Sequence, residues 1–215
     1  MRLLSDALTG LLMLAAIVVI GMAIYRHFGG NADPVASDRE LREGELTALE
    51  PSMLRPVPEG ALAVVVFSDY QCPFCKVAHD SLMGIGEEFE NRLSIGIVHF
   101  PLSRIHPQAF AAAMAAECAR SQGRFFQFDS SLFASRLPLS KEALLDVARV
   151  SGVLDSARFN ACVSSNETRE RIDRHVRSGR RLGIAGTPAF VLGGRLLPVG
   201  TSVEELLERI RGMLN

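Results

Sequence analysis

The sequence predicts an α/β domain in which a mixed β-sheet is flanked by helices and interrupted by an all-helical insertion, preceded by an N-terminal membrane helix. Three observations carry this prediction. The β-branched run from Ala61 to Phe67 is typical of a buried strand. Between about residues 107 and 182 only helical patterns occur. Near the N-terminus, 18 uncharged residues extend from Ala7 to Ile24.

The apolar stretch from Ala7 to Ile24 has three interpretations. An uncleaved single-pass anchor is favoured, because at about 1.5 Å per residue the stretch nearly spans a hydrocarbon core of about 30 Å. A cleaved signal peptide is the second, with Gly21-Met22-Ala23 as a poor cleavage site. A buried soluble helix is least favoured, because the stretch is apolar all round. Arg2 and Arg26 flank it too evenly to set its orientation. We therefore expect residues 1–28 to be an anchor or signal segment.

Residues 29–60 are predicted to be a linker. They contain several prolines and acidic residues and few large apolar ones, with a short helix near Arg39–Ala48. The segment is too short to be a second folded domain. We expect it to hold the folded domain, residues 61–215, away from the membrane.

The overall composition gives no sign of a nucleic-acid partner. The chain of 215 residues has a net charge of −1 and 22% charged residues, without a basic patch interleaved with aromatic residues. Its 48% hydrophobic share is enough for a core, and its length fits one domain plus an anchor. It has four cysteines, whose spacing matters more than their number.

The predicted domain begins with a βαβ unit. After the first strand, a helix is expected from Pro73 to about Glu90, followed by a second strand from Leu93 to Phe100. Such a unit places its two strands side by side and parallel.

Helices and a hairpin complete the predicted domain. The insertion, about residues 107–182, is expected to contain helices at Pro107–Ser121, Phe125–Ser135, Lys141–Val150, Ser156–Ser164 and Thr168–Leu182. Two short strands, Ala189–Leu192 and Arg195–Val199, surround the turn signal Gly193-Gly194 and extend the sheet in antiparallel fashion. A capping box from Thr201 to Glu204 opens the last helix.

The stretch Cys72-Pro73-Phe74-Cys75 opens the first helix of the domain. Pro73 fits the first helical position, so Cys72 is expected at the N-cap. The free backbone N–H groups of Phe74 and Cys75 then point toward the Cys72 sulfur and add to the positive end of the helix dipole. Both effects lower the Cys72 pKa below the free value of about 8.5. Cys75 lies deeper and becomes the resolving sulfur that thiol–disulfide exchange requires.

Two other interpretations of this motif are weaker. A Cys-x-x-Cys pair can be half of a zinc site, and His79 follows Cys75 by four residues. No fourth ligand is evident, and Cys72 and Cys75 lie at a strand-to-helix junction. A purely structural disulfide would close too short a loop to stabilise the fold much. We therefore expect no metal and no cofactor beyond a redox-active Cys72–Cys75 disulfide.

Two distant stretches carry a family resemblance: FSDYQCPFC, from Phe67 to Cys75, and Gly186-Thr187-Pro188 before a strand. Shorter matches add to them, namely Phe100-Pro101-Leu102, His106-Pro107, Ala115–Ala119, Gln122–Phe125, Phe159–Cys162 and Leu182–Ala185. From about Gly60 to Asn215 the chain resembles DsbA-type thiol–disulfide oxidoreductases of the thioredoxin superfamily. The resemblance implies a thioredoxin fold with a helical insertion, in agreement with the order of elements derived above.

The resemblance also implies an environment for the sulfurs. Pro188 would be a cis-proline beside them, a bond that propensity alone does not predict. It would leave the backbone of Thr187 free to pair with an extended substrate segment. Together with Pro73 and Phe74, these two residues are expected to support the active site and bind substrate.

A second disulfide, between Cys118 and Cys162, is implied by the resemblance as a structural bond. From the residues alone, two separate buried thiols are the alternative. Closing a loop of 44 residues would be worth about 4 kcal/mol in the chain-entropy model. Such a bond needs an oxidising compartment, which agrees with export through the N-terminal segment.

The chain departs from the family pattern on its first strand. Related oxidoreductases commonly carry a buried acid six residues before the first cysteine, where this chain has Val66. That carboxylate would relay a proton to or from the resolving cysteine. Asp69 is only a weak substitute, and water or an acid from elsewhere would have to serve.

The sequence therefore predicts a bacterial thiol–disulfide oxidoreductase, tethered to the inner membrane by a single span, with its catalytic domain in the periplasm or another extracytoplasmic space. Cys72 would form the mixed disulfide with thiols of client proteins, and Cys75 would resolve or regenerate it. Oxidation of clients is the favoured direction, with re-oxidation by a quinone-linked thiol oxidase of the membrane. The alternatives are a disulfide isomerase or reductase in the same compartment, or a tethered chaperone or assembly factor with an incidental CxxC.

Overall fold

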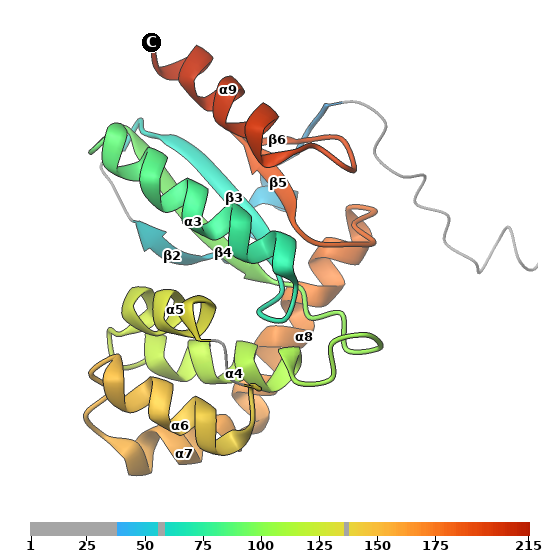
Figure 1. The fold of residues 1–215 in the computed structure, drawn as a ribbon. Helices are drawn as coiled ribbons and strands as arrows, with labels where there is room; N and C mark the ends of the chain where they lie inside the picture. The colour runs from blue at the N-terminus through green and yellow to red at the C-terminus, as the bar shows by residue number, and fades with distance from the viewer. Residues whose placement is uncertain (1–37, 56–58, 136–137) are drawn as a thin grey trace, which may run out of the picture. The chain divides into compact units, whose positions relative to one another are not determined.

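A mixed sheet of six strands lies at the centre of the part of the chain that this computed structural model describes, residues 38–55, 59–135 and 138–215 (Figure 1). The strands are β1 (Arg39–Glu40), β2 (Ser52–Arg55), β3 (Leu62–Ser68), β4 (Leu93–His99), β5 (Ala189–Leu192) and β6 (Arg195–Leu196), in the order β1-β6-β5-β3-β4-β2. β3 and β4 are parallel, and the other neighbours are antiparallel. The predicted βαβ unit and antiparallel hairpin are confirmed.

Helices cover both faces of the sheet. The described helices are α2 (Glu43–Thr47), α3 (Pro73–Glu88), α4 (Ala109–Arg120), α5 (Phe125–Ala134), α6 (Lys141–Val150), α7 (Ser156–Val163), α8 (Asn166–Arg181) and α9 (Val203–Leu214). Because side chains alternate along a strand, Val64 and Val66 of β3 belong to the core cluster that includes α3 and α9, whereas Phe67 packs in the cluster with Leu182 after α8. Figure 1 shows α3 and α9 on one side of the sheet and α8 on the other.

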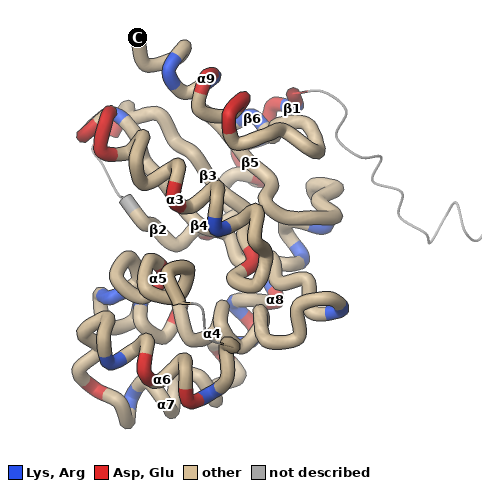
Figure 2. The backbone as a smooth tube through the Cα atoms, viewed as in Figure 1, with Lys and Arg blue, Asp and Glu red and all other residues tan. Residues whose placement is uncertain are grey.

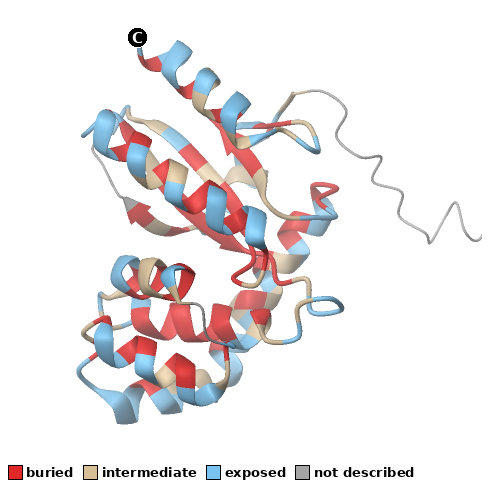
Figure 3. Cartoon of the chain, in the orientation of Figure 1, coloured by how far each residue is buried: buried red, intermediate tan, exposed pale blue. Residues whose placement is uncertain are grey.

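The insertion consists of helices α4 to α8, as expected from the sequence. Its centre is α4, whose residues from Ala112 to Ala119 are all buried (Figure 3). Charged residues of both signs lie on the surrounding helices, while β3, β4 and most of α4 carry none (Figure 2).

The Ser140 and Asp155 side chains cap α6 and α7 by accepting from the backbone N–H groups of Ala143 and Arg158, which explains why both helices begin where the sequence predicts.

A glycine lets α8 approach the sheet closely. A Cβ at Gly179 would lie 2.6 Å from the Phe100 ring and 3.1 Å from the Phe67 ring, closer than such atoms pack. The Phe67 and Phe100 rings meet edge to face, with centroids 6.2 Å apart. This contact fixes the end of α8, from which the chain continues to Thr187.

Residues 39–55 differ from the predicted linker. β1 pairs with β6 and β2 pairs with β4, so this segment forms both edges of the sheet, with α2 between them. The reason is apolar burial: Leu41, Leu49 and Leu54 are each at most 5% exposed. The folded domain therefore begins before residue 61.

Two element ends also differ from the sequence expectation. β6 ends at Leu196 instead of Val199: the Leu197 N–H still donates to the Phe190 carbonyl oxygen of β5, at 2.9 Å, and Pro198, which follows, has no N–H to donate. The N-cap of α9 is Ser202, whose side chain accepts from the Glu205 backbone N–H, so the capping position lies one residue after Thr201.

The N-terminal apolar stretch, Ala7 to Ile24, lies outside the described residues. Within the described ranges, no helix has both the length and the apolar character that crossing a bilayer requires. The expected anchor stays a prediction.

Candidate active site

The CPFC motif lies where β3 gives way to α3. Cys72 is the N-cap of α3, with an extended backbone, and Pro73 occupies the first turn. The Cys72 carbonyl accepts from the N–H groups of Cys75 and Lys76, at 3.1 and 3.3 Å, while its own N–H donates to the Asp69 carbonyl at 3.1 Å. The motif is thereby fixed by backbone bonds on both sides.

A distant segment meets the Cys72 sulfur. The Sγ atom lies 3.3 Å from the Thr187 carbonyl oxygen, 115 residues further along the chain, and the Thr187–Pro188 peptide bond is cis. Within the described residues, the Thr187 side-chain hydroxyl is buried without a hydrogen-bond partner. The structure thus brings Thr187 and Pro188 beside Cys72, as the resemblance implied.

The two sulfurs have opposite acidities. Cys72 and Cys75 are both buried and both free thiols. The pKa of Cys72 is lowered to about 5, first by a hydrogen bond from the Cys75 thiol and further by the N–H groups of Cys75 and Phe74, against the effect of burial. Burial raises the pKa of Cys75 far above its usual value, and the bond it donates to Cys72 adds to this. At neutral pH the site therefore holds one thiolate and one thiol.

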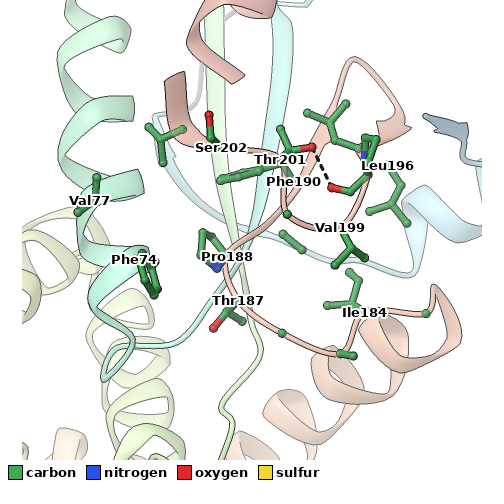
Figure 4. Close-up of a pocket in the computed structure, with 18 of the residues that line it drawn as sticks. Phe74, Val77, Ile184, Thr187, Pro188, Phe190, Leu196, Val199, Thr201 and Ser202 are labelled. Carbon is green, nitrogen blue, oxygen red and sulfur yellow. Dashed lines mark hydrogen bonds between the residues drawn. The ribbon is translucent and has the colours of Figure 1, made fainter. Parts of the chain in front are cut away.

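An apolar groove of about 610 Å³ opens beside the motif. Figure 4 shows Phe74 and Val77 of α3 on one side of it, and Thr187, Pro188 and Val199 on the other. Phe74 is 70% exposed, an unusual placement for a large apolar side chain beside a reactive sulfur. The groove is suited to an extended chain with apolar side chains.

The family's buried acid has no counterpart on β3. Val66 is 2% exposed and packs in the apolar core that includes α3. Asp69 is buried, but its carboxylate accepts from the backbone N–H groups of Gln71 and Leu102, each at 2.7 Å, and lies 2.9 Å from His106 Nδ1. The Asp69 carboxylate therefore connects the loop before α3 to the loop after β4. It is the Asp69 backbone N–H that approaches the Cys75 sulfur, at 3.5 Å.

Comparison with known proteins agrees with this geometry. A family model described as Thioredoxin matches residues 52–211. The chain belongs to the thioredoxin family. The predicted membership of the thioredoxin superfamily is confirmed.

Solved structures share the fold of this thioredoxin-family chain. A thioredoxin-like oxidoreductase from Silicibacter pomeroyi is 26% identical, with a TM-score of 0.67 over 80% of this chain and 98% of that one. The thiol-disulfide exchange protein alpha-DsbA2 from Wolbachia pipientis is 20% identical, with a TM-score of 0.67 over 80% and 91% of the two chains. BdbD from Bacillus subtilis is 18% identical, with a TM-score of 0.68 over 85% and 99%.

Curated relatives match over only part of their length. The Na(+)/H(+) antiporter NhaA 1 of Mycobacterium sp. strain KMS is 31% identical over 144 residues, which are 66% of this chain and 23% of the antiporter. The antiporter NhaA of Herminiimonas arsenicoxydans is 33% identical over 73% of this chain and 26% of its own length. The chain thus spans about a quarter of these relatives, and the match indicates a shared domain.

The second cysteine pair of the thioredoxin-family chain is bonded. Cys118 of α4 and Cys162 of α7 form a disulfide, with Cα atoms 5.7 Å apart and a sequence separation of 44 residues. Cys118 is fully buried. The bond joins two helices of the insertion, which is the pairing that the resemblance implied.

Sequence reasoning missed two buried acids of the insertion. Glu117, 3% exposed, bonds to His99, Arg120 and Arg171 and accepts from the Ser52 hydroxyl. Asp129, 0% exposed, contacts residues on both sides of the CPFC motif. Each is a lone carboxylate on the apolar face of its helix, and that was the available signal.

No metal centre accompanies these groups: among the described residues, no three His, Cys, Asp or Glu side chains are arranged to hold a metal ion. Of the sequence-predicted site residues, the structure gathers Cys72, Cys75, Pro73, Phe74, Thr187 and Pro188 at one place. Cys118 and Cys162 lie apart from them in the insertion.

Proposed function

We propose that this protein oxidises the thiols of client proteins through a Cys72–Cys75 disulfide, in a compartment outside the cytoplasm. The observation that carries the proposal is the unequal acidity of the two sulfurs. A thiolate stabilised at a helix N-terminus favours the reduced enzyme, and a couple whose reduced form is stabilised is a strong oxidant.

The reaction proceeds in two exchange steps. A client thiolate attacks the Cys72 sulfur, the Cys72–Cys75 bond breaks, and Cys75 leaves and takes up a proton, as its raised pKa favours. A second client thiolate then attacks the client sulfur of the mixed disulfide, and Cys72 leaves as a thiolate. The client loses two electrons and two protons, and the enzyme disulfide is reduced.

The groove beside the motif supports an extended, partly apolar client segment. Phe74 and Val77 offer exposed apolar surface, and the Thr187 backbone faces the Cys72 sulfur. A client cysteine between apolar neighbours would fit this surface.

The proposed location is the periplasmic side of the inner membrane, with the N-terminal stretch as its anchor. Two observations support it: the 18 uncharged residues from Ala7 to Ile24, and the Cys118–Cys162 disulfide, a kind of bond rare in reducing compartments. A quinone-linked thiol oxidase of that membrane would re-oxidise the enzyme. Isomerisation or reduction of client disulfides would use the same residues in the opposite direction.

The reduction potential of the Cys72–Cys75 couple, measured against glutathione, tests this proposal. We expect a value above about −150 mV, whereas a value near about −270 mV would identify a reductase. In parallel, Cys75→Ala should trap mixed disulfides formed when the Cys72 thiolate attacks a client disulfide, because the enzyme then has no second thiol to release the client, and Cys72→Ser should trap none. If client maturation is unaffected by Cys72→Ser, the redox function is refuted in favour of a chaperone.

A further inference from the structure

The buried carboxylate of Asp129 contacts both flanks of the redox motif. Asp129 lies on α5, and the exchange steps above do not use it. The Tyr70 hydroxyl donates to its Oδ1 at 2.7 Å, and His79 Nε2 lies 3.0 Å from its Oδ2. Tyr70 precedes Cys72 by two residues, and His79 follows Cys75 by four. One side chain of the insertion thus holds both ends of a ten-residue segment that contains the CPFC motif.

The contact with His79 is that of an ion pair. Its Nδ1 lies 3.1 Å from Asp80 Oδ1, so both ring nitrogens face carboxylate oxygens, which only accept hydrogen bonds. A protonated ring, an imidazolium, can donate from both nitrogens, and Asp129 and Asp80 raise the pKa of His79 against the lowering effect of burial. The Nε2–Oδ2 approach is not aligned as a linear hydrogen bond, but within the described residues neither atom has another partner.

The other titratable groups around this pair are few. Lys76 pairs with Asp80 at 2.6 Å on the exposed side of α3. Tyr70 stays protonated, because burial and then Asp129 raise its pKa well above the usual value. Beyond Tyr70 lies the His99 ring, 5.7 Å between centroids, which is bonded to Glu117.

Burial makes the two contacts depend on each other. An unpaired carboxylate in the interior costs several kcal/mol, so the buried Asp129 side chain needs both of its contacts. Movement of Tyr70 or His79 away from α5 would leave that charge unpaired. The segment from Tyr70 to His79 is therefore held against the insertion at both ends.

We propose that Asp129 is a positioning residue of the exchange reaction, which fixes the segment from Tyr70 to His79 so that the hydrogen-bond donors within CPFC stay aimed at the Cys72 sulfur. The proposal rests on the proposed function, because it concerns the same reactive thiolate. Asp129 touches neither sulfur. It acts through the two flanks, and its loss weakens the donor geometry that keeps Cys72 ionised.

The test is a thiolate titration of the reduced, folded protein, followed by ultraviolet absorbance. Asp129→Asn keeps the shape of the side chain but cannot pair with the imidazolium. We expect the acid dissociation constant of the Cys72 thiol to fall about tenfold, which raises its pKa by about one unit. The equilibrium constant with glutathione should move by up to the same factor toward a weaker oxidant, about 30 mV for this two-electron couple.

Glu117→Gln is the matched control. Glu117 is also a buried acid of the insertion, but its partners lie on β2, β4, α4 and α8. We expect this variant to lower the melting temperature and leave the Cys72 pKa in place. Tyr70→Phe and His79→Gln each remove one contact and should shift the pKa by less than Asp129→Asn. Added to Asp129→Asn, Tyr70→Phe should cause little further change.

Two results would overturn the positioning role: a folded Asp129→Asn protein with an unchanged Cys72 pKa, or an equal shift in Glu117→Gln. If Asp129→Asn does not fold, Tyr70→Phe carries the same test, and an unchanged pKa there rejects the role. A native Cys72 pKa near the free value of about 8.5 would instead count against the proposed function itself.

Discussion

Cys72 and Cys75 stand at the start of a helix on either side of Pro73 and Phe74, whereas Cys118 and Cys162 come from two helices of the insertion, 44 residues apart. The first pair consists of free thiols beside a groove, with backbone donors around one sulfur. The second is a disulfide packed between helices. The residue type is the same in both pairs. Their surroundings therefore decide which pair is suited to thiol–disulfide exchange and which pair forms a structural disulfide.

The largest effect is expected from removal of the structural disulfide between Cys118 and Cys162. Replacing both Cys118 and Cys162 by Ala should lower the free energy of unfolding by about 4 kcal/mol, because the unfolded chain is no longer constrained by a loop of 44 residues. Urea unfolding of oxidised protein measures this. Exchange at temperatures where the variant stays folded should persist. A variant that is as stable as the native protein, or folded but inactive, would contradict the division of roles.

A smaller effect is expected at α8, which begins shortly after Cys162 and ends shortly before Thr187. Gly179→Ala should destabilise the protein by about 1–3 kcal/mol, because the new methyl group meets the Phe100 and Phe67 rings. Gly84→Ala in α3 is the control, since nothing lies within 4 Å of a Cβ there, and it should be neutral or stabilising. Equal stability changes at the two glycines would contradict this account of the α8 contact.

The third prediction concerns pH, to which only the exchanging pair should respond. The pKa of Cys72 is depressed to about 5 in the folded, reduced protein. The stability that its thiolate contributes is therefore fully present above the unfolded value of about 8.5 and is lost as the pH falls through about 5. As the pH rises between these two values, the free energy of unfolding of the reduced protein should increase by up to about 1.4 kcal/mol per pH unit relative to that of the oxidised protein.

Unfolding of the reduced and oxidised proteins across that pH range gives the difference directly. The Cys118–Cys162 disulfide contributes equally to both forms at every pH, provided that the reducing treatment spares it. Parallel pH curves for the two forms would mean that Cys72 has no stabilised thiolate.

The parts of the fold that the sequence predicts are those with local causes. α6 runs from Lys141 to Val150 as expected, because Ser140 caps it and its apolar residues recur at helical spacing. β3 follows from an apolar run that contains three consecutive valines, and β5 from an apolar run that precedes the turn signal Gly193-Gly194. The edge strands β1 and β2 were missed, because segments of two and four residues carry too little pattern to be told from a linker.

The candidate site divides in the same way. The N-cap position of Cys72 and the effect of Pro73 are local, and the sequence predicts both. The contact between Tyr70 and Asp129 joins residues 59 apart, and no spacing rule connects them. Asp129 could be noticed as an acid on an apolar helix face, but its partners appear only when α5 is packed against α3.

The meeting of Cys72 with Thr187 has a consequence for the order in which the site is made. A chain is synthesised from its N-terminus, so the CPFC stretch exists 115 residues before the segment that faces its sulfur. The helices of the insertion and the two cysteines of the structural disulfide also come later in the chain than the CPFC stretch. A nascent chain therefore emerges with Cys72 as an unassembled thiol, and the contact of its sulfur with Thr187 forms only when synthesis has passed that residue.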